Sequence, residues 1–92
     1  MTGLELAQRH GATVLISPLL CYDPRTRAVH LPPRVAHGSD AYALACAAHE
    51  TAHALQPRWW HWLRVIDVAG FPFRNWIEVD AWRRSVRMLH GL

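Results

Sequence analysis

The sequence contains no lysine, only two cysteines and no long uninterrupted run of apolar residues. Two cysteines cannot form the disulfide framework on which many small secreted domains depend. In the most apolar region, residues 59–73, Arg64 and Asp67 interrupt the sequence well before the roughly 18 apolar residues of a membrane span. Residues 1–11 lack the basic end and apolar run of a signal peptide. We therefore expect a cytoplasmic protein without a transmembrane span.

The chain has 92 residues, no internal repeat and no low-complexity linker, so we expect one domain over residues 1–92. A chain of this length buries only about 60% of the surface that its unfolded state exposes. Such small domains usually gain stability from a disulfide, a metal ion or a partner chain. Seven histidines are a high count for this length and favour the metal ion.

All ten basic residues are arginines, and with seven acids they give a net charge of +3. Arg83, Arg84 and Arg87 cluster near the C-terminus. Such a patch can bind nucleic acid or an anionic membrane. No nucleic-acid-binding motif accompanies the patch, so a solvated helix face is favoured and no nucleic-acid partner is expected.

Capping residues, turns and periodicity predict an α+β domain. We expect a helix at 4–10 capped by Thr2, a strand at 12–17, a hairpin with strands at 19–22 and 28–31, a long helix from Ser39 or Asp40 to Gln56, a helical segment at 58–68, and a last helix at 76–90 capped by Asn75. Because two prolines directly follow strand 28–31, we expect this strand at the edge of the sheet.

The long helix contains the pattern His-Glu-x-x-His at residues 49–53. His49 and His53 are four residues apart, so both imidazoles lie on one face of the helix and can bind one zinc ion. Glu50 can reach a water on that ion and act as the general base. The pattern predicts a metal-dependent hydrolytic site.

The faces of this helix predict where the site lies. One apolar face is expected to pack on the core: Ala41, Leu44, Ala45, Ala48, Ala52 and Leu55. The adjacent stripe holds the two histidines with Tyr42 and Cys46. The metal-binding face is therefore expected at the edge of the buried face, beside a cleft.

A catalytic zinc ion usually has three protein ligands, so a third is needed. Glu78 lies in the middle of the apolar face of the last helix, which also carries Ile77, Val79, Ala81, Trp82, Val86, Met88 and Leu89. Burying a carboxylate there is costly unless a cation meets it, which favours Glu78 as the ligand over an internal salt bridge. Asp80 is expected to face solvent with the arginines. His61, Asp67 and Cys46 are further candidates for the third ligand. For Cys46, a buried thiol beside the site is favoured over a ligand role.

Four segments, YDPRTRAVHL at 22–31, HGS at 37–39, AAHETAHALQ at 47–56 and EVDAWRR at 78–84, resemble the YugP-like neutral zinc metallopeptidases of bacteria. The resemblance covers most of the chain in the right order. It implies a minimal zincin domain of the gluzincin type, with a short sheet, an active-site helix and a C-terminal glutamate helix. It also implies one zinc ion held by His49, His53 and Glu78, with Glu50 as the general base.

The sequence departs from this family in two respects. Family members are typically longer and carry membrane-spanning helices, one of them between the two metal-binding helices, whereas residues 58–75 are a short, Trp-rich connector. Related gluzincins often place an acid four residues after the ligand glutamate to orient the first histidine. Here that position is Trp82, so the support of the histidine must differ.

The expected function is that of a zinc metalloendopeptidase, which hydrolyses peptide bonds of a peptide or protein substrate through a zinc-activated water. The strand at 28–31 could bind an extended substrate. The residue that stabilises the oxyanion is not assigned, and the candidates are His30, His37, His61 and Tyr42. The alternative is a non-enzymatic binding or regulatory module with structural zinc, which a fourth ligand such as Cys46 would favour.

The aromatic residues of the connector allow three interpretations. Trp59, Trp60, Trp62, Phe71 and Phe73 can pack over the metal-binding helices. They can also form a homo-oligomer or partner interface, in which Trp is enriched. The third interpretation is peripheral membrane contact, because Trp together with Arg suits the headgroup region.

Overall fold

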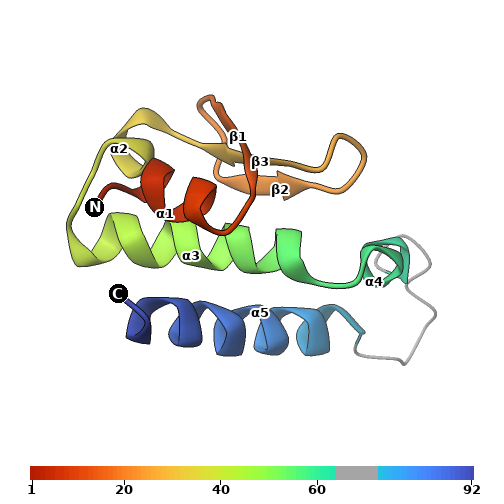
Figure 1. Cartoon of the computed structure of the whole chain (residues 1–92). Coiled ribbons are helices and arrows are strands. Elements are labelled where there is room, and N and C mark those ends of the chain that lie inside the picture. Colours follow the sequence, from red (N-terminus) through yellow and green to blue (C-terminus); the bar gives the residue numbers. More distant parts are fainter. Residues whose placement is uncertain (64–72) are drawn as a thin grey trace.

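A computed structural model of the chain describes residues 1–63 and 73–92. These residues form three strands and five helices, in the order α1 (Gly3–Arg9), β1 (Thr13–Ile16), β2 (Cys21–Asp23), β3 (Ala28–Leu31), α2 (Pro33–Ala36), α3 (Ala41–Leu55), α4 (Arg58–Leu63) and α5 (Phe73–His90). The α+β class is confirmed. Helix α3 lies between α5 on one side and the sheet with α1 and α2 on the other (Figure 1).

The first helix begins where its capping residues predict. The Thr2 side chain accepts a hydrogen bond from the Glu5 backbone N–H at 3.1 Å, and the Glu5 carboxylate accepts one from the Thr2 backbone N–H at 3.1 Å. This reciprocal pair satisfies two N–H groups that a helix start leaves without partners. Gly11, at a φ of +80°, adopts the left-handed conformation directly after the helix.

The sheet has the strand order β1-β3-β2, with β1 parallel and β2 antiparallel to β3. The expected edge position of residues 28–31 is therefore wrong, because β3 is the central strand. Pro32 and Pro33 lie beyond Leu31, the last paired residue of β3, and so remove no hydrogen bond from the ladder. Pro33 instead begins the short helix α2, where a missing N–H costs nothing. Helix α2 is not among the elements predicted from sequence.

Helix α3 is buried on two sides, and its expected core face is therefore only partly right. Ala48 and Ala52 are buried as predicted, whereas Ala41 and Leu55 are exposed. Ala43 and Ala47 are buried against the other layer. A Cβ atom added to Gly38 would lie 2.7 Å from the Cβ of Ala43, and one added to Gly3 would lie 3.1 Å from the Cβ of Ala47. Small residues on both partners thus allow this close approach.

The hydrophobic core joins the layers on both sides of α3. It consists of Leu6, Val29, Leu31, Val35, Ala36, Ala47, Ala48, Ala52, Ala81 and Met88. The last two residues come from α5, so this helix packs on α3 through one side.

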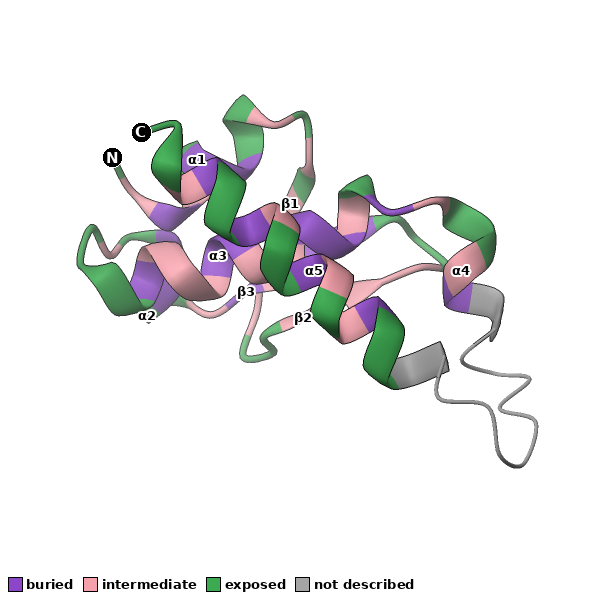
Figure 2. Ribbon diagram, turned by 90° about the horizontal axis from the view of Figure 1, so that it is seen from below, coloured by how far each residue is buried: buried purple, intermediate pink, exposed green. Residues whose placement is uncertain are grey.

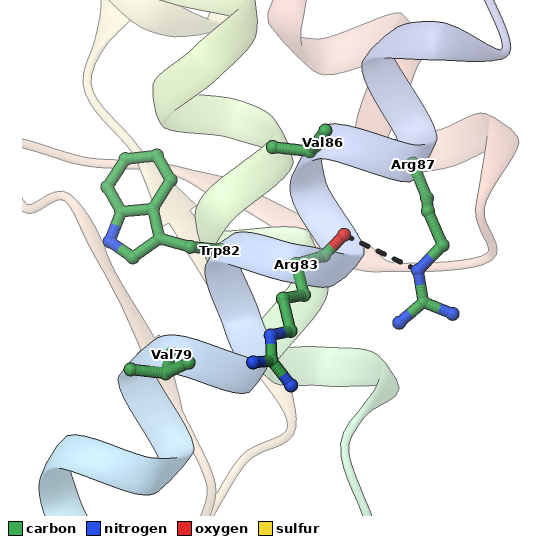
Figure 3. Close-up of a pocket in the computed structure, with 5 residues that line it drawn as sticks. All are labelled: Val79, Trp82, Arg83, Val86 and Arg87. Carbon is green, nitrogen blue, oxygen red and sulfur yellow. Dashed lines mark hydrogen bonds between the residues drawn. The ribbon is translucent and has the colours of Figure 1, made fainter.

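The opposite side of α5 is exposed, which corrects the expectation of one broad buried face. Ile77, Ala81 and Met88 are buried, but Val79, Trp82 and Val86 are about half exposed. Exposed and buried residues alternate along α5 in Figure 2. The three exposed apolar side chains, with Arg83 and Arg87, line a groove of about 600 Å³ on α5 (Figure 3). The expected cap is also wrong, because α5 begins at Phe73 and Asn75 lies within it.

The connector after α3 is helical at its start, in α4. Trp60 stacks on Trp76 of α5 with ring centroids 4.4 Å apart. Trp59 is exposed and does not belong to the core. Asp67, Phe71 and the side chains of Trp62 and Phe73 lie outside the described residues. Among the helices described, none has both the length and the apolar character needed to cross a membrane.

Candidate metal centre

Three predicted side chains converge between α3 and α5. His49 Nε2 lies 3.0 Å from Glu78 Oε2, and His53 Nε2 lies 3.3 Å from Glu78 Oε1. One ligand atom from each residue can be chosen so that all lie within 4.8 Å of one another. The two histidines come from successive turns of α3, and Glu78 reaches them from the facing helix.

The geometry of these atoms fits a zinc ion. A tetrahedral zinc with bonds of about 2.0–2.1 Å keeps its ligand atoms about 3.4 Å apart. The two histidine–glutamate separations lie close to that value. Both imidazoles present the same nitrogen, Nε2, to the carboxylate, so small movements of the three side chains would make room for the ion.

The three side chains open onto a pocket of about 300 Å³ that Glu50 also lines. The remaining lining residues are Leu20, Cys21 and Tyr22. The last two belong to β2, so the sheet forms the wall opposite α3. Neither Cys21 nor Tyr22 was predicted as a site residue, because periodicity does not reveal which strand covers a helix face.

The two β2 side chains are protonated at neutral pH, and burial reinforces this state. Burial raises the pKa of the Tyr22 phenol, an effect that Asp23 adds to and Arg27 opposes. Burial also raises the pKa of the Cys21 thiol, as do the nearby carboxylates of Glu50 and Asp23. The pocket wall therefore offers a neutral O–H and a neutral S–H group.

His53 is held by a series of hydrogen bonds behind its ring. His53 Nδ1 lies 2.9 Å from Gln56 Oε1, and Gln56 Nε2 donates to the Ile77 carbonyl at 2.7 Å and to Asp80 Oδ2 at 2.9 Å. Arg84 Nε donates to the same Asp80 oxygen at 2.7 Å. Asp80 makes the expected salt bridge, but the expectation that it faces solvent is wrong because its carboxylate is directed to Gln56.

These contacts decide the charge of Asp80. Burial alone would raise the pKa of its carboxyl group, but hydrogen bonds from Gln56 and Arg84 and the positive charge of Arg84 outweigh that effect. The pKa of Asp80 is therefore lowered, and the group is an ionised acceptor at neutral pH.

His49 has different surroundings. Its ring stacks on Trp82, with centroids 4.2 Å apart and an interplanar angle of 32°, and meets His53 edge-on at 4.8 Å. Its Nδ1 is buried and has no hydrogen-bond partner among the described residues. Trp82 thus supports His49 by packing.

The other candidate residues lie elsewhere. His61 Nε2 donates to the backbone carbonyl of His53 at 2.8 Å, and His61 does not belong to the three-residue cluster. Cys46 packs against the core, also outside the cluster.

The remaining candidates for stabilising the oxyanion do not line the pocket. His30 lies 3.1 Å from the Ser17 hydroxyl, and His37 is exposed at the end of α2. Tyr42 is exposed beneath Arg34. Of the residues described, Tyr22 is thus the one with a hydroxyl group in the pocket wall.

Two histidines and a glutamate are the ligand set of one class of catalytic zinc sites, found in metallopeptidases. The comparison with protein families agrees with this class. The chain belongs to the family described as "Putative neutral zinc metallopeptidase", whose sequence model matches residues 19–78 and thus includes all four candidate site residues. The resemblance found in the sequence is confirmed. No curated protein and no solved structure matches the chain.

Proposed function

We propose that the protein is a zinc-dependent endopeptidase with a gluzincin-like site. The observation that carries the proposal is the convergence of His49, His53 and Glu78 in a pocket that Glu50 also lines. Membership of the zinc metallopeptidase family supports it. One zinc ion would be held by the two histidines and Glu78.

Zinc, when bound, supplies Lewis-acid chemistry, because it polarises a carbonyl and lowers the pKa of water from 15.7 to about 7. Glu50 lies next to His49 in the chain and faces the same pocket. Its carboxylate accepts the proton of the attacking water and then donates that proton to the amine of the departing peptide.

Tyr22 is the proposed donor to the oxyanion. Its ring stacks on His61 with centroids 5.0 Å apart, which orients it in the wall of the pocket. The raised pKa keeps its proton available for donation. A fixed donor of this kind stabilises the charge that develops on the carbonyl oxygen. Tyr22→Phe is expected to lower kcat about 100-fold and to leave zinc affinity unchanged.

The edge strand β2 is the proposed binding site for the substrate backbone. Within residues 1–63 and 73–92, β3 is paired on both sides and β2 is paired with β3 alone. Cys21 and Tyr22 of β2 also line the pocket. An extended peptide that adds to this edge brings its carbonyl groups to the site by main-chain hydrogen bonding.

Metal analysis combined with a peptide-library cleavage assay tests the proposed function. Glu50→Gln is expected to keep stoichiometric zinc and to lose activity by at least about 100-fold. Glu78→Ala is expected to lose zinc. Glu5→Gln, which retains the capping pattern of α1 at a distance from the site, serves as the control for both measurements.

The alternative is a binding module with structural zinc. A closed structural site needs a fourth protein ligand, whereas the cluster found in the described residues has three. Wild-type protein that binds stoichiometric zinc through four protein ligands and cleaves no peptide in the library would support this alternative and contradict the proposed endopeptidase.

A further inference from the structure

Gln56 at the C-terminal end of α3 uses its whole side-chain amide for contacts within the protein. The residue is 5% exposed. Its oxygen faces His53 Nδ1, and its nitrogen faces the Ile77 carbonyl and the Asp80 carboxylate. No other side chain among those described joins a candidate metal ligand on α3 to the backbone of α5 in this way.

The acceptors on α5 determine how the amide is oriented. The Ile77 carbonyl only accepts hydrogen bonds, so it requires the NH₂ group of Gln56. The second hydrogen of that group points to Asp80 Oδ2, the oxygen that also accepts from Arg84. The amide oxygen must then face His53. Because this oxygen only accepts, His53 Nδ1 must carry the hydrogen of that contact.

The orientation of the amide thus determines the tautomer of His53. In the neutral ring a proton on Nδ1 leaves the lone pair on Nε2, the atom that faces Glu78 Oε1. Metal-binding histidines usually donate their other N–H to a carboxylate, a backbone carbonyl or water. Here the acceptor is a neutral amide that the Asp80 carboxylate holds in turn.

We propose that Gln56 is a positioning residue for the metal centre, fixing the tautomer and ring orientation of His53, with Asp80 and Arg84 holding Gln56 in place. The bond to Ile77 gives Gln56 a second role. Ile77 directly precedes Glu78. The Gln56 side chain therefore contacts both His53 on α3 and the backbone next to Glu78 on α5, and it holds the two ligands in position relative to each other. This inference rests on the proposed zinc site.

The test replaces the amide by an apolar side chain of similar length. Gln56→Met is expected to lower zinc affinity about 10- to 100-fold in a competition titration with a chelator, because the Nδ1–H loses its acceptor. Gln8→Met, on the exposed side of α1, is the matched control and is expected to retain wild-type affinity. Circular dichroism verifies that both variants are folded.

Two further measurements separate positioning from simple packing. Asp80→Asn leaves an oxygen that accepts from Gln56 and is expected to retain more zinc affinity than Asp80→Leu, which leaves none. In zinc-free wild-type protein, ¹⁵N NMR is expected to find a proton on His53 Nδ1, whether or not Nε2, which faces the Glu78 carboxylate, also carries one. This spectrum needs no variant and decides the question if Gln56→Met does not fold.

Two results would overturn the inference: folded Gln56→Met with wild-type zinc affinity, or a His53 ring that carries no proton on Nδ1. Failure of the proposed function is a different outcome. Wild-type protein that binds zinc but cleaves no peptide contradicts the peptidase and leaves the affinity comparison intact. Wild-type protein that binds no zinc contradicts the metal site itself, whereas the tautomer measurement still reports on Gln56.

Discussion

The two sides of helix α3 differ in what they contact. Towards α1, α2 and the sheet, α3 presents small side chains such as Ala43 and Ala47, which lie close to glycine backbone. Towards α5 it presents His49 and His53, whose contacts are polar or aromatic. We refer to these as the packing side and the metal side. The difference suggests that stability and metal affinity can be changed separately.

The largest effect on stability is expected from Leu6→Ala on the packing side. Leu6 is 0% exposed and belongs to the core. Removing a fully buried leucine side chain costs about 2–5 kcal/mol of unfolding free energy, to be measured by urea denaturation. Zinc affinity of the folded fraction is expected to stay at the wild-type value. A loss of affinity in molecules that remain folded would show that the two sides are coupled.

Gly38→Ala is expected to have the next largest effect. The added Cβ would lie 2.5 Å from the Arg34 carbonyl oxygen and 2.7 Å from the Cβ of Ala43, so backbone must shift. The expected loss is about 1–3 kcal/mol in the same denaturation experiment. Gly91→Ala is the control, because the nearest atom would be 3.5 Å away. Equal stability of the two variants would contradict the close packing of α3 described above.

Trp82→Ala addresses the metal side. Removing the indole takes away the ring that stacks on His49, and we expect zinc affinity to fall about tenfold. Trp82→Phe keeps an aromatic ring and is expected to retain most of the affinity. A chelator competition titration measures both variants. If Trp82→Ala binds zinc like the wild type, packing by Trp82 does not support the metal-binding position of His49.

The acid dependence of stability provides a smaller test near the start of α3. Hydrogen bonds from Arg34, and its charge, lower the pKa of the exposed Asp40 carboxyl below its ordinary value. A lowered pKa in the folded state stabilises the protein above the unfolded-state pKa of about 3.9, and this contribution is lost as the pH falls through the folded-state value.

Urea denaturation between pH 6 and pH 3 should therefore show a steeper loss of stability for wild type than for Asp40→Asn. Arg34→Gln is expected to resemble Asp40→Asn, because the same pair is lost. Parallel profiles for all three proteins would show that the Arg34–Asp40 pair contributes no pH-dependent stability.

The smallest effect is expected on the outward side of α5. Val86 is 47% exposed, so Val86→Ser should change the unfolding free energy by less than about 0.5 kcal/mol. Val35 is 2% exposed in the packing layer, and Val35→Ser is expected to cost several times more, because it buries a hydroxyl and removes apolar contacts. Similar costs at both sites would indicate that α5 is covered on its outward side in solution.

The local parts of the structure were the most predictable from sequence. Thr2 begins α1, and the spacing of His49 and His53 predicts their shared face, because both depend on residues within a few positions of each other. Glu78 could be selected because an acid in the middle of an apolar helix face needs a partner. The structure places it beside both histidines.

The parts that depend on long-range packing could not be predicted in the same way. The prolines after Leu31 indicate only that the chain leaves the ladder there, and they do not reveal that β1 pairs with β3 in parallel. Asp80 lies with the arginines on a helical wheel. In the structure, however, Gln56 at the C-terminal end of α3 packs against Asp80 and donates a hydrogen bond to its carboxylate. The periodicity of a helix carries no information about which neighbouring element packs on each of its faces.

The placement of His53 and Glu78 on different helices has a thermodynamic consequence. An ion bound to both would close a loop in the chain, which contains α4 and the residues up to α5. Because the unfolded chain does not preform such a site, metal binding would be coupled to folding. Above saturation, each tenfold rise in free zinc would then add about 1.4 kcal/mol to the unfolding free energy. The melting temperature of this protein would consequently depend on the zinc concentration of its surroundings.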